Sequence, residues 1–201
     1  MKPVCIVMAA GKGSRFGSNK LLAELEGRPL FCWGLDAIDP ALFARVIVVT
    51  GYEPVAQEAV RRGYLAVENT APELGVSRTI RLGLEAAGAC GGALFMTADQ
   101  PLLTGQTLRK LTEAFSAEPE RIWAAARNGK RGNPCIFPAE LLPELAVLEG
   151  DTGGSAVIRR YPDRVRLLEV PAEELFDCDT PEALAICREK TAKKIRKICK
   201  K

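Results

Sequence analysis

The segment at residues 9–20, AAGKGSRFGSNK, follows a short apolar run and combines three glycines with Arg15 and Lys20. Backbone N–H groups exposed by a tight glycine turn attract phosphate oxygens, and two cations on the same loop strengthen that attraction. A dinucleotide-binding fingerprint would need glycine where Phe16 stands, and a P-loop would need Ser or Thr where Leu21 stands. The segment therefore predicts a phosphate-binding loop of a different type.

Two further segments supply carboxylates. Asp99 follows the apolar run at 93–97, and Asp177 and Asp179 precede the sequence TPEAL. Magnesium in proteins usually takes one or two carboxylates together with substrate phosphates. Asp99 is expected to be one metal ligand and Asp179 the second, with Asp177 competing for that role. Asp179 or Thr180 is also expected to cap the helix that follows.

Two glycine-containing turns are expected in the second half, and they suit the close approach of another substrate. They are Gly132-Asn133-Pro134 and the run GDTGG, which holds Asp151, Gly153 and Gly154. Plain turn chemistry is the alternative interpretation of both. The chain contains no histidine, so reactions that use a histidine base or histidine-bound zinc are excluded. Carboxylates, lysines, arginines, backbone amides and a hard cation remain to carry the chemistry.

Composition narrows the class of protein. The chain has 201 residues, of which 47% are hydrophobic and 26% charged, typical of a globular domain. Seven of its 28 basic residues lie in residues 190–201, so the rest carries an acidic excess and does not suggest nucleic-acid binding. Seven cysteines without metal-type spacing, and no signal or membrane segment, lead us to expect a reduced, cytoplasmic protein.

Strand and helix patterns alternate through the first 116 residues. This alternation predicts a mostly parallel sheet with helices on both faces, and such sheets bind ligands beyond the carboxyl ends of their strands. Ser77 and Thr104 are expected to cap helices. Strands are predicted at 3–8, 45–50, 64–68, 93–97, 122–126, 135–137 and 164–170, and helices at 29–38, 53–62, 77–87, 104–115, 139–145, 154–160 and 180–198. One domain is expected over residues 1–189, with residues 190–201 as a basic helix end or tail.

These motifs together identify a family. The first loop fits the pattern Ala-Ala-Gly-x-x-x-Arg-x-Gly-x-x-Lys, and residues 4–184 resemble the MobA-like nucleotidyltransferases, within them the molybdenum cofactor cytidylyltransferases. The resemblance implies a three-layer α/β/α Rossmann-like nucleotidyltransferase fold with a mostly parallel sheet. It also implies magnesium and the transfer of CMP from CTP to molybdopterin cofactor, with pyrophosphate as the second product. A molybdenum hydroxylase is an expected recipient of that product.

The resemblance also implies roles for individual residues. Arg15, Lys20 and Asp99 are expected to be catalytic, and Asp99 and Asp179 to hold the metal. The nucleotide is expected to contact Ala9, Ala10, Gly11, Gly13, Ser14, Gly17, Asn69, Gly75 and Ser77. The acceptor is expected to contact Gly132, Asn133, Pro134, Asp151 and Gly153. Ala10 favours the cytidylyl branch, since the guanylyl branch usually has glycine there, and Asn133 replaces a common histidine.

Three alternatives remain open at this point. A related nucleotidyltransferase could use GTP, or accept a sugar, polyol or choline phosphate, because acceptor identity depends on the less specific second half. A non-catalytic cofactor carrier is disfavoured because Lys20 and Asp99 are both present. A Rossmann-type oxidoreductase is disfavoured by Phe16.

Overall fold

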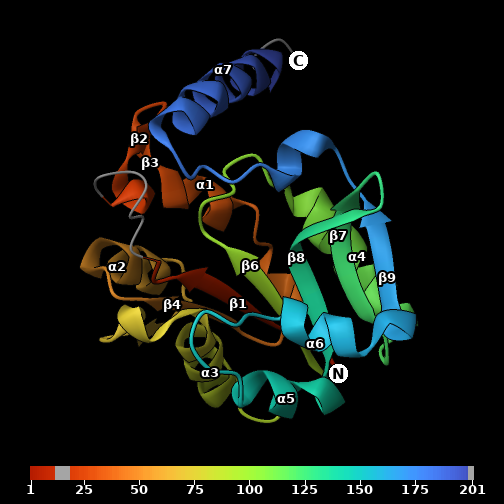
Figure 1. Cartoon of the computed structure of the whole chain (residues 1–201). Coiled ribbons are helices and arrows are strands. Elements are labelled where there is room, and N and C mark those ends of the chain that lie inside the picture. Colours follow the sequence, from red (N-terminus) through yellow and green to blue (C-terminus); the bar gives the residue numbers. More distant parts are fainter. Residues whose placement is uncertain (12–18, 199–201) are drawn as a thin grey trace.

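The computed structural model describes the backbone of residues 1–11 and 19–198, and the side chains as far as Ala192. A seven-stranded sheet runs through the middle of this part in the order β5-β4-β1-β6-β8-β7-β9 (Figure 1). Its strands are β1 (Val4–Ala9), β4 (Val46–Thr50), β5 (Leu65–Glu68), β6 (Gly92–Thr97), β7 (Ile122–Arg127), β8 (Lys130–Pro138) and β9 (Val165–Glu169). A two-stranded ribbon, β2 (Glu24–Leu25) and β3 (Arg28–Pro29), was not predicted.

The pairing of the strands is mostly parallel, as the alternation predicted. β1 lies between β4 and β6 and is parallel to both, β5 continues parallel to β4, and β7 is parallel to β9. β8 is antiparallel to both of its neighbours, β6 and β7. The carboxyl ends of β1 and β6 therefore meet at one edge of the sheet, where the glycine-rich loop and Asp99 begin.

Helices cover both faces of the sheet. Alternate residues of each central strand point to opposite sides: Cys5 and Val7 of β1 pack with α1, α2 and α4, whereas Val4 and Ile6 pack with α3, α5 and α6. Figure 1 shows the sheet between these two groups. The helices are α1 (Leu30–Asp36), α2 (Glu53–Arg61), α3 (Val76–Ala87), α4 (Gly105–Ala117), α5 (Leu142–Ala146), α6 (Ser155–Arg160) and α7 (Pro181–Ile198). The predicted three-layer α/β/α arrangement is confirmed.

The ends of three helices test the capping predictions. The Thr104 hydroxyl accepts a hydrogen bond from the Thr107 N–H at the start of α4, and Thr180 accepts one from the Ala183 N–H at the start of α7. The prediction for Ser77 is wrong, because α3 begins one residue earlier and Gly75 occupies the cap position without a side-chain bond. Thr180 is thus the cap of α7, and the Asp179 side chain does not serve as that cap.

The Gly132-Asn133-Pro134 motif does not form the turn that glycine suggested. These residues lie inside β8, whose hairpin with β7 turns at Asn128 and Gly129. Both turn residues have positive φ angles, 50° and 72°, as a tight two-residue hairpin requires. The register between β7 and β8 shifts between Ala124 and Ala126, so the motif lies opposite an irregularity in the partner strand.

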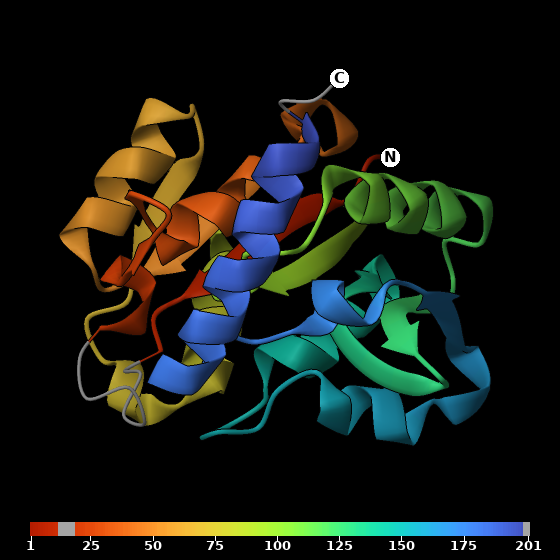
Figure 2. The same ribbon diagram turned by 90° about the horizontal axis from the view of Figure 1, so that it is seen from above.

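The C-terminal helix α7 packs across the end of the molecule beside β2 (Figures 1 and 2). Its anchor is a separate apolar cluster made of Leu25, Leu30, Leu102, Cys178, Leu184 and Cys187. The expected division at residue 189 falls within this helix, which continues to Ile198. Among the described residues, no helix combines the length and apolar character needed to cross a membrane.

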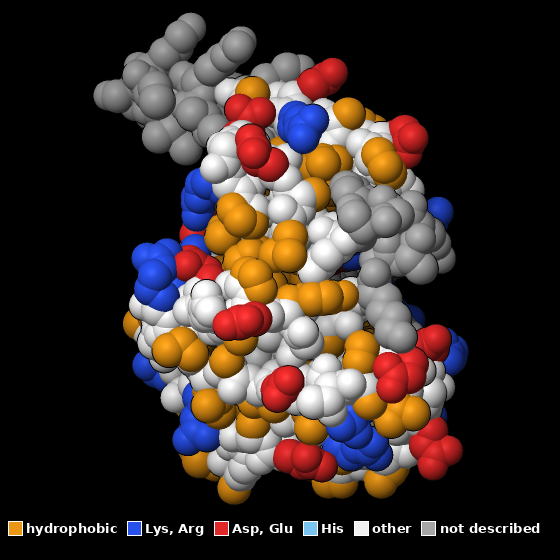
Figure 3. All heavy atoms as spheres, turned by 90° about the vertical axis from the view of Figure 1, so that its left-hand side faces the viewer, with side chains coloured by type: hydrophobic (Ala, Val, Ile, Leu, Met, Phe, Trp, Pro, Cys, Tyr) orange, Lys and Arg blue, Asp and Glu red, His pale blue; other side chains and the backbone are white. Residues whose placement is uncertain are grey.

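Charge on the described surface is mixed. Figure 3 shows lysine and arginine side chains interspersed with aspartate and glutamate on one face, and neither sign forms a continuous area among the residues coloured there. Part of this mixture is a group that joins two helices: Glu58 of α2 accepts hydrogen bonds from Arg61 and Arg62, and Arg62 also pairs with Asp36 of α1 at 2.8 Å.

Glu58→Gln is predicted to lower the free energy of unfolding by about 1 kcal/mol at pH 7. Hydrogen bonds from Arg61 and then Arg62 lower the pKa of Glu58 to about 2, against burial, which alone would raise it. Because the folded-state pKa is depressed, this stabilisation is present above the unfolded-state pKa and is lost as pH falls toward 2. Urea denaturation from pH 7 to pH 2.5 measures it.

The matched control for that experiment is Glu113→Gln, which changes an exposed glutamate of α4. A stability loss for Glu58→Gln that stays constant down to pH 2.5 would contradict the proposed role of its charge.

Candidate active site

A cleft of about 530 Å³ opens where the carboxyl ends of β1 and β6 meet. Its walls come from the end of β1, the end of β6, the start of α3 and the segment after α5. Among its lining residues are seven that the sequence predicted for the site: Ala9, Ala10, Gly11, Lys20, Gly75, Asp99 and Asp151. The topology rule that ligands bind beyond the ends of parallel strands thus selects the region where these residues lie.

Two side chains, one from the last residue of β4 and one from the segment between β4 and α2, hold the start of the glycine-rich loop. The Thr50 hydroxyl donates a hydrogen bond to the Ala9 carbonyl at 3.0 Å, and the Tyr52 hydroxyl donates one to the Gly11 carbonyl at 2.9 Å. Gly11 therefore leaves β1 in a defined direction. The predicted residues Gly13, Ser14, Arg15 and Gly17 lie outside the described part of the chain, so their roles stay predictions.

Lys20 brings together carboxylates from distant parts of the chain. Its ammonium group donates to Asp99, which follows β6, and to Asp179, which precedes α7. The side chains of Lys20 and Asp99 are nearly buried, 13% and 12% exposed, whereas that of Asp179 is 44% exposed. Burial alone would lower the pKa of Lys20, but the two carboxylates outweigh it and raise that pKa. Lys20 is therefore a fixed positive charge.

Two hydrogen bonds attach the C-terminal segment to the loop after β6. The Cys178 N–H donates to the Asp99 carbonyl at 3.0 Å, and the Gln100 side chain donates to Asp177 at 2.9 Å. Burial and then the charge of Asp99 raise the pKa of Asp177 to about 6, although Gln100 opposes the rise. Asp177 is thus engaged by Gln100, and the structure brings Asp179 to Lys20 instead. Sequence reasoning had left these two aspartates in competition and had missed Gln100.

The end of β6 also holds polar atoms suited to a hard cation. Thr97 Oγ1, Asp99 Oδ1 and Gln100 Oε1 are buried and have no hydrogen-bond partner in the described structure. No cluster of three or more aspartate, glutamate or cysteine side chains that could hold a metal occurs among the described residues. Two carboxylates beside a substrate are nevertheless the usual protein ligands of magnesium. Asp99 and Asp179 therefore fit a divalent ion that completes its coordination on a ligand.

Asn69 and Ser77 do not line the cleft. Asn69 is 1% exposed, and its side-chain amide donates a hydrogen bond to the Thr79 hydroxyl. The amide oxygen accepts hydrogen bonds from the Arg78 side chain and the Ala71 N–H, and these bonds hold the turn before α3. Ser77 is buried and donates its backbone N–H to the Gly150 carbonyl at 3.2 Å. Both residues therefore have structural partners, and a contact with nucleotide would be indirect.

Gly75 lies where two backbone segments touch. Its φ angle is +90°, and a Cβ atom there would lie 2.2 Å from the Gly150 carbonyl carbon. Any other residue would push the segment around Gly150 away from α3. The start of α3 and this segment thus form a wall of main-chain atoms with Asp151 beside it.

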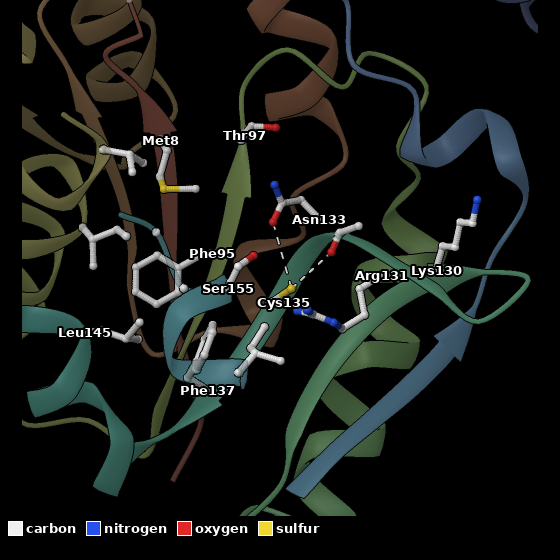
Figure 4. A pocket seen from close by; sticks show the side chains of 16 residues that line it. Met8, Phe95, Thr97, Lys130, Arg131, Asn133, Cys135, Phe137, Leu145 and Ser155 are labelled. Carbon is white, nitrogen blue, oxygen red and sulfur yellow. Dashed lines mark hydrogen bonds between the residues drawn. The ribbon is translucent and has the colours of Figure 1, made fainter. Parts of the chain in front are cut away.

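A second pocket of about 580 Å³ adjoins the cleft, and Met8, Val76 and Thr97 line both. Of the residues predicted to face an acceptor, Gly132, Asn133 and Gly153 line this pocket (Figure 4). Asp151 lines the first cleft instead, and Pro134 is buried in β8 without lining either. Sequence reasoning missed Lys130 and Arg131, although two adjacent cations beside the Gly132 motif were a usable signal.

Comparison with protein families gives one match over most of the chain. A model of the MobA-like NTP transferase domain matches residues 5–165. Among curated proteins, the bifunctional protein GlmU of Acidovorax sp. is 35% identical over 123 residues, which are 56% of this chain and 26% of that protein. GlmU of Pelobacter propionicus is 38% identical over 114 residues, or 53% and 24% of the two chains. The chain thus spans about a quarter of the length of these relatives.

Solved structures resemble the fold over almost its whole length. Rv0371c from Mycobacterium tuberculosis H37Rv has a TM-score of 0.75 and 25% identity, with 94% of this chain and 99% of that chain covered. A nucleotidyl transferase from Methanothermobacter thermautotroptrophicus has a TM-score of 0.80 and 23% identity, with 96% and 99% covered. The latter likeness is one of fold alone.

Lys20→Met is predicted to lower the free energy of unfolding by about 2 kcal/mol in metal-free buffer. It leaves the nearly buried carboxylate of Asp99 without its counter-charge. Magnesium should raise the Tm of Lys20→Met more than that of the unchanged protein, because the ion replaces the lost ammonium charge. Differential scanning calorimetry with and without magnesium measures both effects.

Lys110→Met, which changes an exposed lysine of α4, is the control. Equal magnesium shifts for the unchanged protein and both variants would contradict a metal site at Asp99 and Asp179.

Proposed function

The chain belongs to the MobA-like NTP transferase domain family, and we propose on that premise that it transfers a nucleoside monophosphate from an NTP to a phosphorylated acceptor. The specific reaction proposed is CTP plus molybdopterin cofactor giving the cytosine dinucleotide and pyrophosphate. The observation that carries the proposal is the placement of Lys20 between Asp99 and Asp179 at the cleft where β1 and β6 end.

The triphosphate is assigned to this cleft. Backbone N–H groups around Gly11 and the cation of Lys20 supply positive potential, which favours phosphate oxygens. Asp99 and Asp179 would hold a divalent ion, which when bound supplies charge neutralisation of the phosphates. Rv0371c, whose fold this chain shares, has also been solved as a complex with manganese. Arg15 is assigned to the pyrophosphate end of the same loop.

The reaction needs no strong base. An oxygen of the acceptor phosphate forms a new bond to the α-phosphorus of the NTP, and the bond from that phosphorus to the bridging oxygen of pyrophosphate breaks. A phosphate nucleophile is ionised at neutral pH, so no proton has to be removed from it, in keeping with a chain without histidine. Lys20 then acts by holding the leaving phosphates and by balancing their charge.

The second pocket is assigned to the acceptor. It shares Met8, Val76 and Thr97 with the nucleotide cleft, so molecules in the two sites would meet there. Its floor is apolar, with Phe95 and Phe137 edge-to-face at 5.9 Å between ring centres, and no aspartate or glutamate among the described residues lines it. A flat ring system suits such a floor better than a sugar or polyol, whose hydroxyl groups need many polar partners. This favours molybdopterin over the sugar and polyol phosphates.

A panel of substrates tests the reaction directly. Pyrophosphate release is expected to be fastest with CTP and molybdopterin cofactor, and slower with GTP or with sugar, polyol and choline phosphates. Faster turnover with GTP would overturn the choice of base, which depends on Ala10. Faster turnover with a sugar phosphate would overturn the choice of acceptor.

Lys20→Ala is predicted to lower turnover by about 10- to 100-fold, because a charge-assisted hydrogen bond contributes about 1.5–3 kcal/mol. Asp99→Asn should lower turnover further, because loss of this carboxylate charge also weakens binding of the divalent ion. Steady-state pyrophosphate assays at saturating CTP measure both, with Lys110→Ala as the control for loss of a surface lysine. Turnover of Lys20→Ala within threefold of the unchanged protein would remove Lys20 from the site.

A further inference from the structure

The second pocket exists because β8 separates from β6. The two strands pair from Gly92 with Pro138 as far as Phe95 with Cys135, and beyond that point β8 pairs with β7 alone. Apolar side chains, among them Phe95 and Phe137, line one side of the resulting gap, and the first residues of β8 line another. The first residues of β8, which the proposed function has not used, therefore form one side of the pocket.

Those first residues are cations without partners. Lys130 and Arg131 line the pocket, and within the described part of the chain neither side chain has a hydrogen bond or ion pair. In Figure 4 the side chain of Arg131 is directed toward Cys135, whose thiol feels its charge, whereas the side chain of Lys130 points away. A cation above an apolar floor and without a carboxylate beside it is a favourable position for an anion.

The surrounding groups do not supply that anion. Cys135 lines the same pocket and is electrostatically influenced by Arg131, but burial raises the pKa of its thiol to about 12, so it is neutral. Its thiol donates to the Gly132 carbonyl at 3.2 Å. Glu169 of β9, beside the turn of the β7–β8 hairpin, accepts hydrogen bonds from the N–H groups of Asn128 and Gly129.

We propose that Arg131 is a specificity-determining residue that binds the phosphate group of the acceptor, whose ring system lies on Phe95 and Phe137. Lys130 adds a second, more distant charge. The assignment rests on the proposed function for the identity of the pocket as the acceptor site. It adds that the pocket selects a phosphomonoester that carries a ring system over an uncharged molecule of the same shape, through the paired donors of a guanidinium group.

The test uses 1-naphthyl phosphate and 1-naphthol, which differ only in the phosphate. Calorimetry on the full chain in EDTA, without nucleotide, measures their affinities. The unchanged protein is expected to prefer the phosphate by about 10-fold or more, the range of one charge-assisted hydrogen bond. Arg131→Ala should abolish the preference, and Arg131→Lys should restore part of it.

The control variant is Arg127→Ala, which removes an exposed arginine of the same hairpin that lines neither pocket. It should leave the preference unchanged. Loss of the preference in both variants, its retention in Arg131→Ala, or displacement of the naphthyl phosphate by CTP would each overturn the assignment.

The same titrations separate this inference from the proposed function. CTP affinity, measured with magnesium in all variants, is expected to be unaffected by Arg131→Ala. Failure of CTP to bind any variant, together with an Arg131-dependent preference for the phosphate, would refute nucleotidyl transfer and leave an anion site. CTP binding without that preference would refute the role of Arg131 alone.

Discussion

The ion pairs of Lys20 with Asp99 and Asp179 are the interaction on which the rest of the site depends. Asp99 lies 79 positions and Asp179 lies 159 positions from Lys20 in the chain. The two ion pairs therefore hold the loop after the first strand, the loop after β6 and the start of α7 as one unit. The backbone bond from Cys178 to Asp99 and the bond from Gln100 to Asp177 reinforce the same junction. Lys20 also supplies the counter-charge of Asp99, whose nearly buried carboxylate would otherwise be costly to bury.

Much of the fold was predictable because the physical signals are local. Runs such as RVIVVT and ALFMT, buried on both faces, predict central parallel strands, and the alternation with amphipathic helices predicts the layers. The errors also have local causes. Gly132 was interpreted as a turn, but the stronger hairpin signal was the pair Asn128-Gly129 next to it. Ser77 was interpreted as a cap, but Gly75, with a positive φ angle, occupies the cap position and α3 begins at Val76.

The site was predictable in part. Lys20, Asp99 and Asp179 could be proposed from their place at strand and helix ends, where topology brings them together. Which of Asp177 and Asp179 contacts Lys20 could not be predicted, because Asp177 is bound by Gln100, a partner 77 positions away. The pocket lined by Arg131 is similarly invisible in the sequence, since it arises where β8 stops pairing with β6. The relatives match about half of this chain and a quarter of their own length, so acceptor choice has to be argued from this pocket.

The contact between Gly75 and Gly150 has a consequence for which positions of the cleft can accept a substitution. The wall of main-chain atoms formed there offers no side chain for substitution at Gly75, because a larger residue would overlap the Gly150 backbone. The distance between the start of α3 and the segment around Gly150 is therefore fixed by the backbone itself. Any change in the shape of the cleft has to arise at lining positions that carry side chains, such as Thr79 and Asp151.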